Sequence, residues 1–167
     1  MTGKNSRIRI VIADDHTIFR DGLKTLLAGR PELQVVGEAC DGNEALTLVN
    51  KMRPDILLLD MSMPKASGMY VLRSLAGSSN HNTMHTILLS GALEGEEITR
   101  AFEFGARGIV LKDSAAQMLF KSIAAVMAGE YWIGRQSFAN CIEALKQHRH
   151  AAKKTPKNFG LTAREME

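Results

Sequence analysis

Short apolar runs alternate with longer segments of helical periodicity through residues 1–133, and this alternation narrows the choice of fold more than any other feature. Runs rich in β-branched side chains and leucine predict strands, and apolar side chains spaced three and four residues apart predict the helices between them. The predicted strands are Arg7–Ala13, Gln34–Ala39, Asp55–Asp60, His85–Ser90 and Gly108–Lys112. Five strand–helix pairs in this order are typical of an α/β protein with a parallel sheet and helices on both faces.

The later helices have clearer boundaries than the earlier ones. The pattern predicts a fourth helix over Glu94–Phe104, a fifth over Ser114–Ala128 that begins with a hydroxyl cap, and a sixth over Arg135–His148. Four apolar side chains of the sixth helix recur at i, i+3, i+4 and i+7: Phe138, Cys141, Ile142 and Leu145. This face needs an apolar surface, which either the domain itself or a second copy of the chain provides.

Composition and charge exclude several classes of protein. Hydrophobic residues make up 45% of the chain and charged residues 23%, unlike collagen-like, disordered or coiled-coil sequences. No apolar run approaches the roughly 20 residues of a membrane span, and the amino terminus lacks a secretory signal. With only Cys40 and Cys141, we expect free thiols and a cytoplasmic location. Residues 134–167 hold 7 basic against 3 acidic side chains, an excess that suits nucleic acid or an ordinary solvated linker.

Acidic, hydroxyl and basic side chains stand where the predicted strands end. Asp14 and Asp15 follow the first strand directly, and the ends of the third, fourth and fifth strands are Asp60, Ser90 and Lys112. The carboxyl ends of parallel strands emerge at one edge of a sheet, so we expect these side chains to converge there. Each residue alone is commonly a helix cap, a turn former or a solvated charge. Their occurrence together, in this order at the strand ends, indicates a functional site.

Three carboxylates at one edge predict a bound cation. Like charges 4 Å apart repel by about 4 kcal/mol at an effective dielectric near 20. Mg²⁺ prefers oxygen ligands and keeps room for a phosphoryl oxygen, so Asp14, Asp15 and Asp60 are the candidate ligands. With the charge screened by the ion and by Lys112, Asp60 is the predicted nucleophile toward phosphorus.

Several separate stretches carry a resemblance to one known family. They are IRIVIADDHTIFRDGL, VVGEACDGNEAL, PDILLLDMSMPKASGMYVLRSL, ILLSGA and GARGIVLKDS, and GLTAREME is similar to the opening of a DNA-binding domain. The sequence resembles the receiver domain of two-component response regulators, in the nitrate-regulator and LuxR (NarL/FixJ) subfamily with a carboxyl-terminal helix-turn-helix. The resemblance implies a flavodoxin-like fold, with a five-stranded parallel sheet in the order 2-1-3-4-5 and five helices.

The resemblance also implies roles for the residues at the sheet edge. Asp60 is the implied phosphoacceptor, and Asp14 and Asp15 are the implied acidic pair for Mg²⁺. Lys112 is the implied phosphoryl contact, and the backbone carbonyl of Ser62 is a further implied metal ligand. The implied phosphodonor is a phosphohistidine on a sensor histidine kinase.

The switch part of the pattern departs from the family. Ser90 takes the place of the hydroxyl residue that turns inward to the phosphoryl group, and Gly91 leaves the attack path open. Where the family usually has an aromatic residue, three positions before Lys112, this chain has Ile109. We expect Ile109 to stay buried in both the phosphorylated and the unphosphorylated state. The coupling of phosphorylation to the response is then weak or depends on other residues. His16 is interpreted as a surface or capping residue.

The predicted organisation has three parts. Residues 1–133 form the receiver domain, 134–158 form a linker with an amphipathic helix, and 159–167 begin a truncated LuxR-type helix-turn-helix domain. The resemblance implies a regulator and not an enzyme, which reaches DNA only through the missing helix-turn-helix and binds no membrane. We also expect a homodimer through helical faces, including Phe102 and Phe104 or the sixth helix.

Two other functions compete with this interpretation. One is a receiver-like interaction module that binds partners whatever its phosphorylation state, which the departure at Ile109 keeps open. The other is a Mg²⁺-dependent phosphohydrolase with an aspartyl intermediate, for which the sequence offers no evident cap domain. Transfer of a phosphoryl group to Asp60 would separate the leading function from the interaction module.

Overall fold

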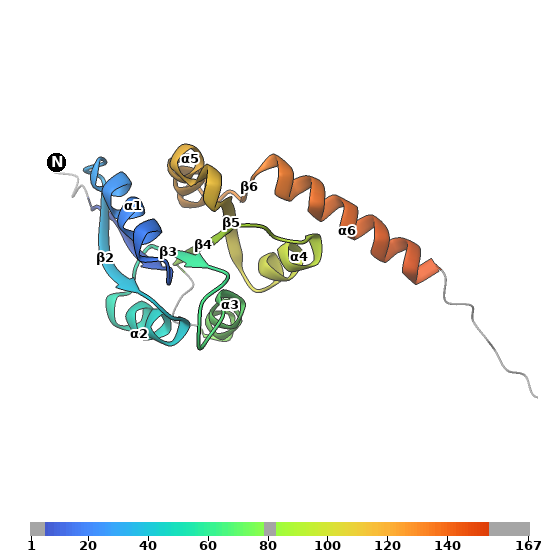
Figure 1. The fold of residues 1–167 in the computed structure, drawn as a ribbon, viewed down its shortest axis with the longest axis horizontal. Helices are drawn as coiled ribbons and strands as arrows, with labels where there is room; N and C mark the ends of the chain where they lie inside the picture. Colours follow the sequence, from blue (N-terminus) through green and yellow to red (C-terminus); the bar gives the residue numbers. More distant parts are fainter. Residues whose placement is uncertain (1–5, 79–82, 154–167) are drawn as a thin grey trace, which may run out of the picture.

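A single parallel sheet organises the computed structural model, which describes residues 6–78 and 83–153 (Figure 1). Its strand order is β2-β1-β3-β4-β5-β6, and all neighbouring pairs are parallel. The strands are β1 (Ile8–Ala13), β2 (Leu33–Ala39), β3 (Ile56–Asp60), β4 (His85–Ser90), β5 (Ala106–Leu111) and β6 (Trp132–Ile133). The predicted flavodoxin-like fold and the order of its first five strands are confirmed.

Helices cover both faces of the sheet. They are α1 (Thr17–Ala28), α2 (Gly42–Met52), α3 (Gly68–Ala76), α4 (Gly95–Glu103), α5 (Ala115–Met127) and α6 (Arg135–Lys153). Helices α1 and α5 pack on one face, and α2, α3 and α4 pack on the other (Figure 1). The predicted fourth helix matches α4, because Glu94 and Phe104 are its two cap residues.

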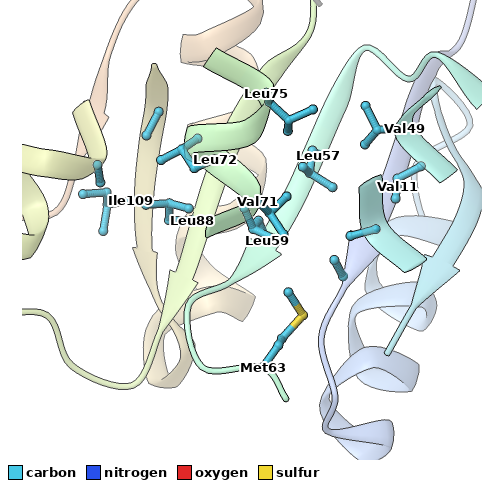
Figure 2. Packing of buried hydrophobic residues seen from close by; sticks show 14 of the residues in the cluster. Val11, Val49, Leu57, Leu59, Met63, Val71, Leu72, Leu75, Leu88 and Ile109 are labelled. Carbon is cyan, nitrogen blue, oxygen red and sulfur yellow. The ribbon is translucent and has the colours of Figure 1, made fainter. Parts of the chain in front are cut away.

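The core consists of two apolar layers, one on each face of the sheet. Neighbouring side chains along β1 enter different layers: Ile10 and Ile12 face α1 and α5, whereas Val11 and Ala13 face α2 and α3. The second layer continues across the sheet to Ile109 (Figure 2). Because both faces are buried, the strands read as continuous apolar runs without polar alternation.

Strand boundaries differ from the prediction at β5 and beyond it. β5 begins at Ala106, two residues earlier than predicted, because Ala106 is buried and pairs with Thr86 on β4. β5 ends at Leu111, and Lys112 begins a 3₁₀ turn instead of closing the strand. The two-residue strand β6 was not predicted, since so short a segment has no readable period.

Helix α6 is longer than predicted, and the domain leaves most of its apolar face exposed. It runs past α4 and away from the sheet (Figure 1). Phe138 is 54% exposed and Leu145 is 45% exposed, so of the predicted apolar face only Cys141 packs against the core. Of the two surfaces that the sequence left open for this face, the domain covers only Cys141, because small and polar residues of α6 approach α4 instead; a second copy as its cover stays a prediction.

The carboxyl-terminal predictions fall partly outside the structure. The predicted linker, 134–158, contains α6 in its first part, whereas 154–158 and the predicted start of a helix-turn-helix at 159–167 lie outside the described residues. Within the described ranges, no helix combines the length and the apolar character that crossing a membrane requires.

Candidate functional site

Two buried aspartates occupy the carboxyl edge of the sheet. Asp14 follows β1 and Asp60 ends β3, and these neighbouring strands place the two side chains at 0% and 1% exposure. The amide of Asp14 donates to the carbonyl of Ala39 on β2 at 3.0 Å, which extends the β1–β2 ladder into the site. Asp15 lies beside them and is half-buried. Strand register therefore fixes where the carboxylates point.

Lys112, which follows β5, contacts both aspartates at the same carboxyl edge of the sheet. Its Nζ lies 2.8 Å from Asp14 Oδ2 and 3.0 Å from Asp60 Oδ2. The 3₁₀ turn after β5 carries the ammonium over the end of β4 to the centre of the edge. Its ammonium also lies over an aromatic ring, with Nζ 4.9 Å from the ring centroid of Phe19. The structure thus brings together side chains from β1, β3 and the end of β5.

The charges of this cluster depend on one another. Burial raises the pKa of the Asp60 carboxyl above its ordinary value; the Ser62 amide and Lys112 oppose this rise, and the Asp14 charge adds to it. Burial works against the charge on Lys112, but hydrogen bonds to Asp14 and Asp60 raise its pKa overall. The ammonium therefore stays charged and partly neutralises two carboxylates that would otherwise repel each other.

The donor set fits a hard divalent cation. Apart from their ion pairs with Lys112 and His16, three buried carboxylate oxygens accept no hydrogen bond from any described residue: Asp14 Oδ2, Asp15 Oδ1 and Asp60 Oδ2. Lys112 supplies charge to two of them but leaves their lone pairs poorly satisfied. Buried oxygens of this kind are costly unless something binds them, and oxygen donors at this density suit Mg²⁺.

Of the two serines predicted at the site, Ser62 contacts Asp60 and the Ser90 hydroxyl bonds its own loop. The backbone amide of Ser62 donates to Asp60 Oδ1 at 3.1 Å, so the loop after β3 holds the carboxylate. The role of the Ser62 carbonyl as a metal ligand stays a prediction. Ser90 is buried at the end of β4, but its hydroxyl donates to the carbonyl of Ala92 at 2.8 Å. Its hydroxyl is engaged by its own loop in this conformation.

The switch position also has a defined place. Ile109 is 1% exposed and belongs to the apolar layer under α4 (Figure 2). Gly91 has open space around it, because a Cβ placed there meets no atom within 4 Å. The buried isoleucine agrees with the expectation for this conformation, and the loop after Ser90 has room for a ligand or a rearrangement.

His16 has contacts at the site that the sequence did not indicate. As predicted, it is a surface residue at the cap position of α1, although its side chain makes no capping hydrogen bond. The imidazole is 65% exposed as expected, yet its Nδ1 lies 3.2 Å from Asp14 and 3.1 Å from Asp15. No sequence pattern indicates this contact, because a side-chain rotamer decides it.

Two further residues position the carboxylates. Arg20 on α1 donates to the carbonyl of Asp14 at 2.7 Å and pairs with Glu38 on β2 at 3.2 Å. Gly68, the first residue of α3, lies so close to the carbonyl oxygen of Asp60 that a Cβ would overlap it. Both contacts join separate elements, so local sequence gives no sign of them.

Comparison with known sequences identifies relatives of the chain. Residues 10–124 match the family model described as the response regulator receiver domain. The transcriptional regulatory protein DegU of Brevibacillus brevis is 34% identical over 142 residues, covering 85% of this chain and 59% of DegU. The nitrate/nitrite response regulator protein NarL of Escherichia coli K12 is 34% identical over 121 residues, covering 72% of this chain and 55% of NarL. The chain thus spans little more than half the length of these relatives.

Solved structures give the same picture. A two-component response regulator of the LuxR family from Aurantimonas sp. SI85-9A1 superposes with a TM-score of 0.77 at 30% identity, covering 84% of this chain and 99% of that one. The signal receiver domain of a NarL response regulator from Mycobacterium tuberculosis superposes with a TM-score of 0.69 at 34% identity, covering 75% and 99%. The likeness therefore extends over the sheet and the helices that carry the site.

Proposed function

Because the chain belongs to the response regulator receiver domain family, we propose that it accepts a phosphoryl group on Asp60 from a sensor histidine kinase. One observation carries the proposal: Lys112 lies within 3.0 Å of both buried carboxylates, Asp14 and Asp60. That arrangement holds a nucleophilic oxygen and a fixed positive charge at one point, as phosphoryl transfer requires.

The transfer uses the carboxylate of Asp60 as nucleophile. As an oxygen of Asp60 bonds to phosphorus, the phosphorus–nitrogen bond of the phosphohistidine breaks and its electron pair returns to the imidazole. The Ser62 amide, 3.1 Å from Asp60 Oδ1, keeps the carboxylate oriented during the attack. Lys112 stabilises the negative charge on the phosphoryl oxygens, since its position beside Asp60 costs no reorganisation.

The acidic residues Asp14, Asp15 and Asp60, with the Ser62 carbonyl, would hold Mg²⁺. When bound, the ion neutralises carboxylate charge and polarises the phosphoryl oxygens. The buried oxygens of the three aspartates, which accept no hydrogen bond beyond their ion pairs with Lys112 and His16 among the described residues, support this assignment.

Signal output starts from Ser90 and the loop after it. The Ser90 hydroxyl leaves the carbonyl of Ala92 and turns to the phosphoryl group, which changes the loop leading into α4. Ile109 keeps its buried place and contributes no aromatic switch. Typical allosteric coupling free energies are about 1 to 3 kcal/mol, so the loss of one contact in this loop would remove a large part of the response.

A protein that carries this chain together with a helix-turn-helix would regulate transcription. We assign residues 1–133 to the receiver domain and 134–158 to a linker, with DNA bound by a helix-turn-helix that begins at 159–167. DegU is named as a transcriptional regulatory protein and NarL as a nitrate/nitrite response regulator protein. The two free cysteines agree with a cytoplasmic protein. A homodimer through helical faces is supported by exposed apolar side chains on α6.

Phosphorylation by a small donor tests the proposal directly. The chain is incubated with Mg²⁺ and acetyl phosphate, and intact mass is followed for one added phosphoryl group. We expect the adduct in the wild type and its loss in Asp60→Asn, because the amide is no nucleophile. Asp21→Asn is the matched control, since Asp21 is an exposed aspartate on α1 paired only with Lys24 in the structure.

Two outcomes would contradict the proposal. An adduct that persists in Asp60→Asn would move the phosphoacceptor elsewhere. Absence of an adduct with any donor would favour an interaction module that works without phosphorylation, a function that family membership does not favour.

A further inference from the structure

An imidazole nitrogen stands among the carboxylates of the acidic site. His16 Nδ1 lies 3.2 Å from Asp14 Oδ1, 3.1 Å from Asp15 Oδ1 and 3.9 Å from Asp60 Oδ2. One donor atom from each of these four residues lies within 4.8 Å of the others. A nitrogen donor thus belongs to the same cluster as the oxygen donors.

The spacing of these atoms matches the spacing of metal ligands. Atoms bound about 2.1 Å from an octahedral ion lie about 3.0 Å apart at adjacent positions. The separations of Nδ1 from Asp14 and Asp15, 3.2 and 3.1 Å, are close to that value. The separation from Asp60, 3.9 Å, lies between those of adjacent and opposite positions. Small shifts of the imidazole would bring all four donors around one ion.

The local backbone explains why His16 faces the site. Its amide donates to Asp14 Oδ1 at 2.8 Å, which closes a turn directly after the aspartate pair. Nδ1 is also the ring atom near Lys112 Nζ, 3.4 Å away, so this nitrogen is turned inward. The side chain fills no core position and makes no helix cap, so the polar contacts of Nδ1 with Asp14, Asp15 and Lys112 account for its orientation.

We propose that His16 Nδ1 is a direct ligand at the acidic site, and that the site therefore binds first-row transition cations such as Mn²⁺ and Co²⁺ through nitrogen as well as oxygen. Imidazole favours these ions over Mg²⁺, whose ligands are almost always oxygens. Apart from their ion pairs with Lys112, the buried oxygens Asp14 Oδ2 and Asp60 Oδ2 accept no hydrogen bond from a described residue, which supports a cation at this position. The inference rests on the proposed function only in requiring a divalent ion there.

Pulsed electron paramagnetic resonance of the Mn²⁺-loaded protein tests the ligand directly. We expect the nitrogen hyperfine coupling of a bound imidazole in the wild type and its absence in His16→Ala. Removing a metal-binding imidazole should weaken Mn²⁺ and Co²⁺ binding about tenfold or more, with a much smaller change for Mg²⁺. Isothermal titration gives the three affinities. His85→Gln is the matched control, because His85 begins β4 at the opposite end of the strand from the site.

The outcomes separate this inference from the proposed function. A wild-type protein that binds Mn²⁺ without nitrogen coupling, or equal losses of Mn²⁺ and Mg²⁺ affinity in His16→Ala, would overturn the nitrogen ligand. The phosphoryl adduct with Mg²⁺ is measured on the wild type, as for the proposed function. Failure of the wild type to form that adduct would overturn the proposed function and leave the coupling result standing.

Discussion

The acidic edge of the sheet and the contact between α4 and α6 show two different relations between sequence and structure. At the edge, residues far apart in sequence meet where strand ends were predicted to meet. At the α4–α6 contact, an apolar pattern predicted a face that packs on the domain or on a second copy, and the domain leaves most of that face exposed. The comparison teaches that topology predicts which residues converge, whereas periodicity does not predict which surface a helical face contacts.

The physical reason lies in what controls each position. A parallel sheet fixes the ends of its strands through the backbone, so Asp14 and Asp60 need only their places in the chain. The face through which a surface helix packs depends on how closely its backbone can approach the neighbouring helix. At Gly95 a Cβ would overlap the carbonyl of Asn140, and Asn140 donates from its side chain to Leu93, so the absence of bulk sets this contact.

The largest expected effect comes from crowding the acidic edge. Gly68→Ala puts a Cβ onto the carbonyl of Asp60, and backbone cannot yield as a flexible side chain does. We expect a loss of about 3 kcal/mol or more in unfolding free energy in urea, together with slower phosphoryl uptake. Gly22→Ala on α1 is the control: it meets no atom within 4 Å and should stabilise by about 0.5 to 1 kcal/mol. Equal stabilities for the two variants would show that the edge tolerates displacement.

The next effect measures the electrostatic strain at the edge. Asp60→Asn removes one buried charge beside Asp14 and should raise the unfolding free energy by about 1 to 2 kcal/mol near pH 7. Because the pKa of Asp60 is raised in the folded protein, its native state gains a proton at higher pH than the unfolded chain does. The wild-type penalty is therefore present above the folded pKa and disappears as pH falls through it. Urea unfolding of both proteins across this pH range checks the sign, and a gap that stays constant with pH would contradict it.

A smaller effect is expected where α6 meets α4. Gly95→Val should separate the two helices at a cost of about 1 kcal/mol, and the receiver core should stay folded. Cys141 lies half-buried beside Thr99, with its sulfur 3.8 Å from the threonine hydroxyl, so its alkylation should speed up about tenfold. The exposed Cys40 serves as an internal control with an unchanged rate. Unchanged alkylation of Cys141 would mean that α6 stays docked without this close approach.

The smallest effect belongs to the predicted apolar face of α6. Phe138→Ser and Leu145→Ser remove exposed side chains, and each should change the unfolding free energy by less than about 0.5 kcal/mol. Thermal unfolding checks the stability, and light scattering checks whether the same variants alter self-association. A larger loss of monomer stability would show that this face packs on the domain after all.

Prediction from sequence succeeded for the residues whose place is set by the ends of parallel strands. The five strands, the placement of Asp14 and Asp60 at one edge, and the arrival of Lys112 beside them all follow from parallel topology. The strand β6 and the early start of β5 did not follow, because neighbouring strands extend the ladder beyond what local pattern indicates.

By itself, the sequence determined the fold class, the strand order through family resemblance, and the acidic cluster with its basic partner. Only the tertiary structure decided the inward turn of His16, the closeness of Gly68 to Asp60, and the face through which α6 packs. The first set follows from backbone order, which the sequence encodes locally. The second depends on rotamers and on the close fit of elements distant in sequence, which exist only once the chain has folded.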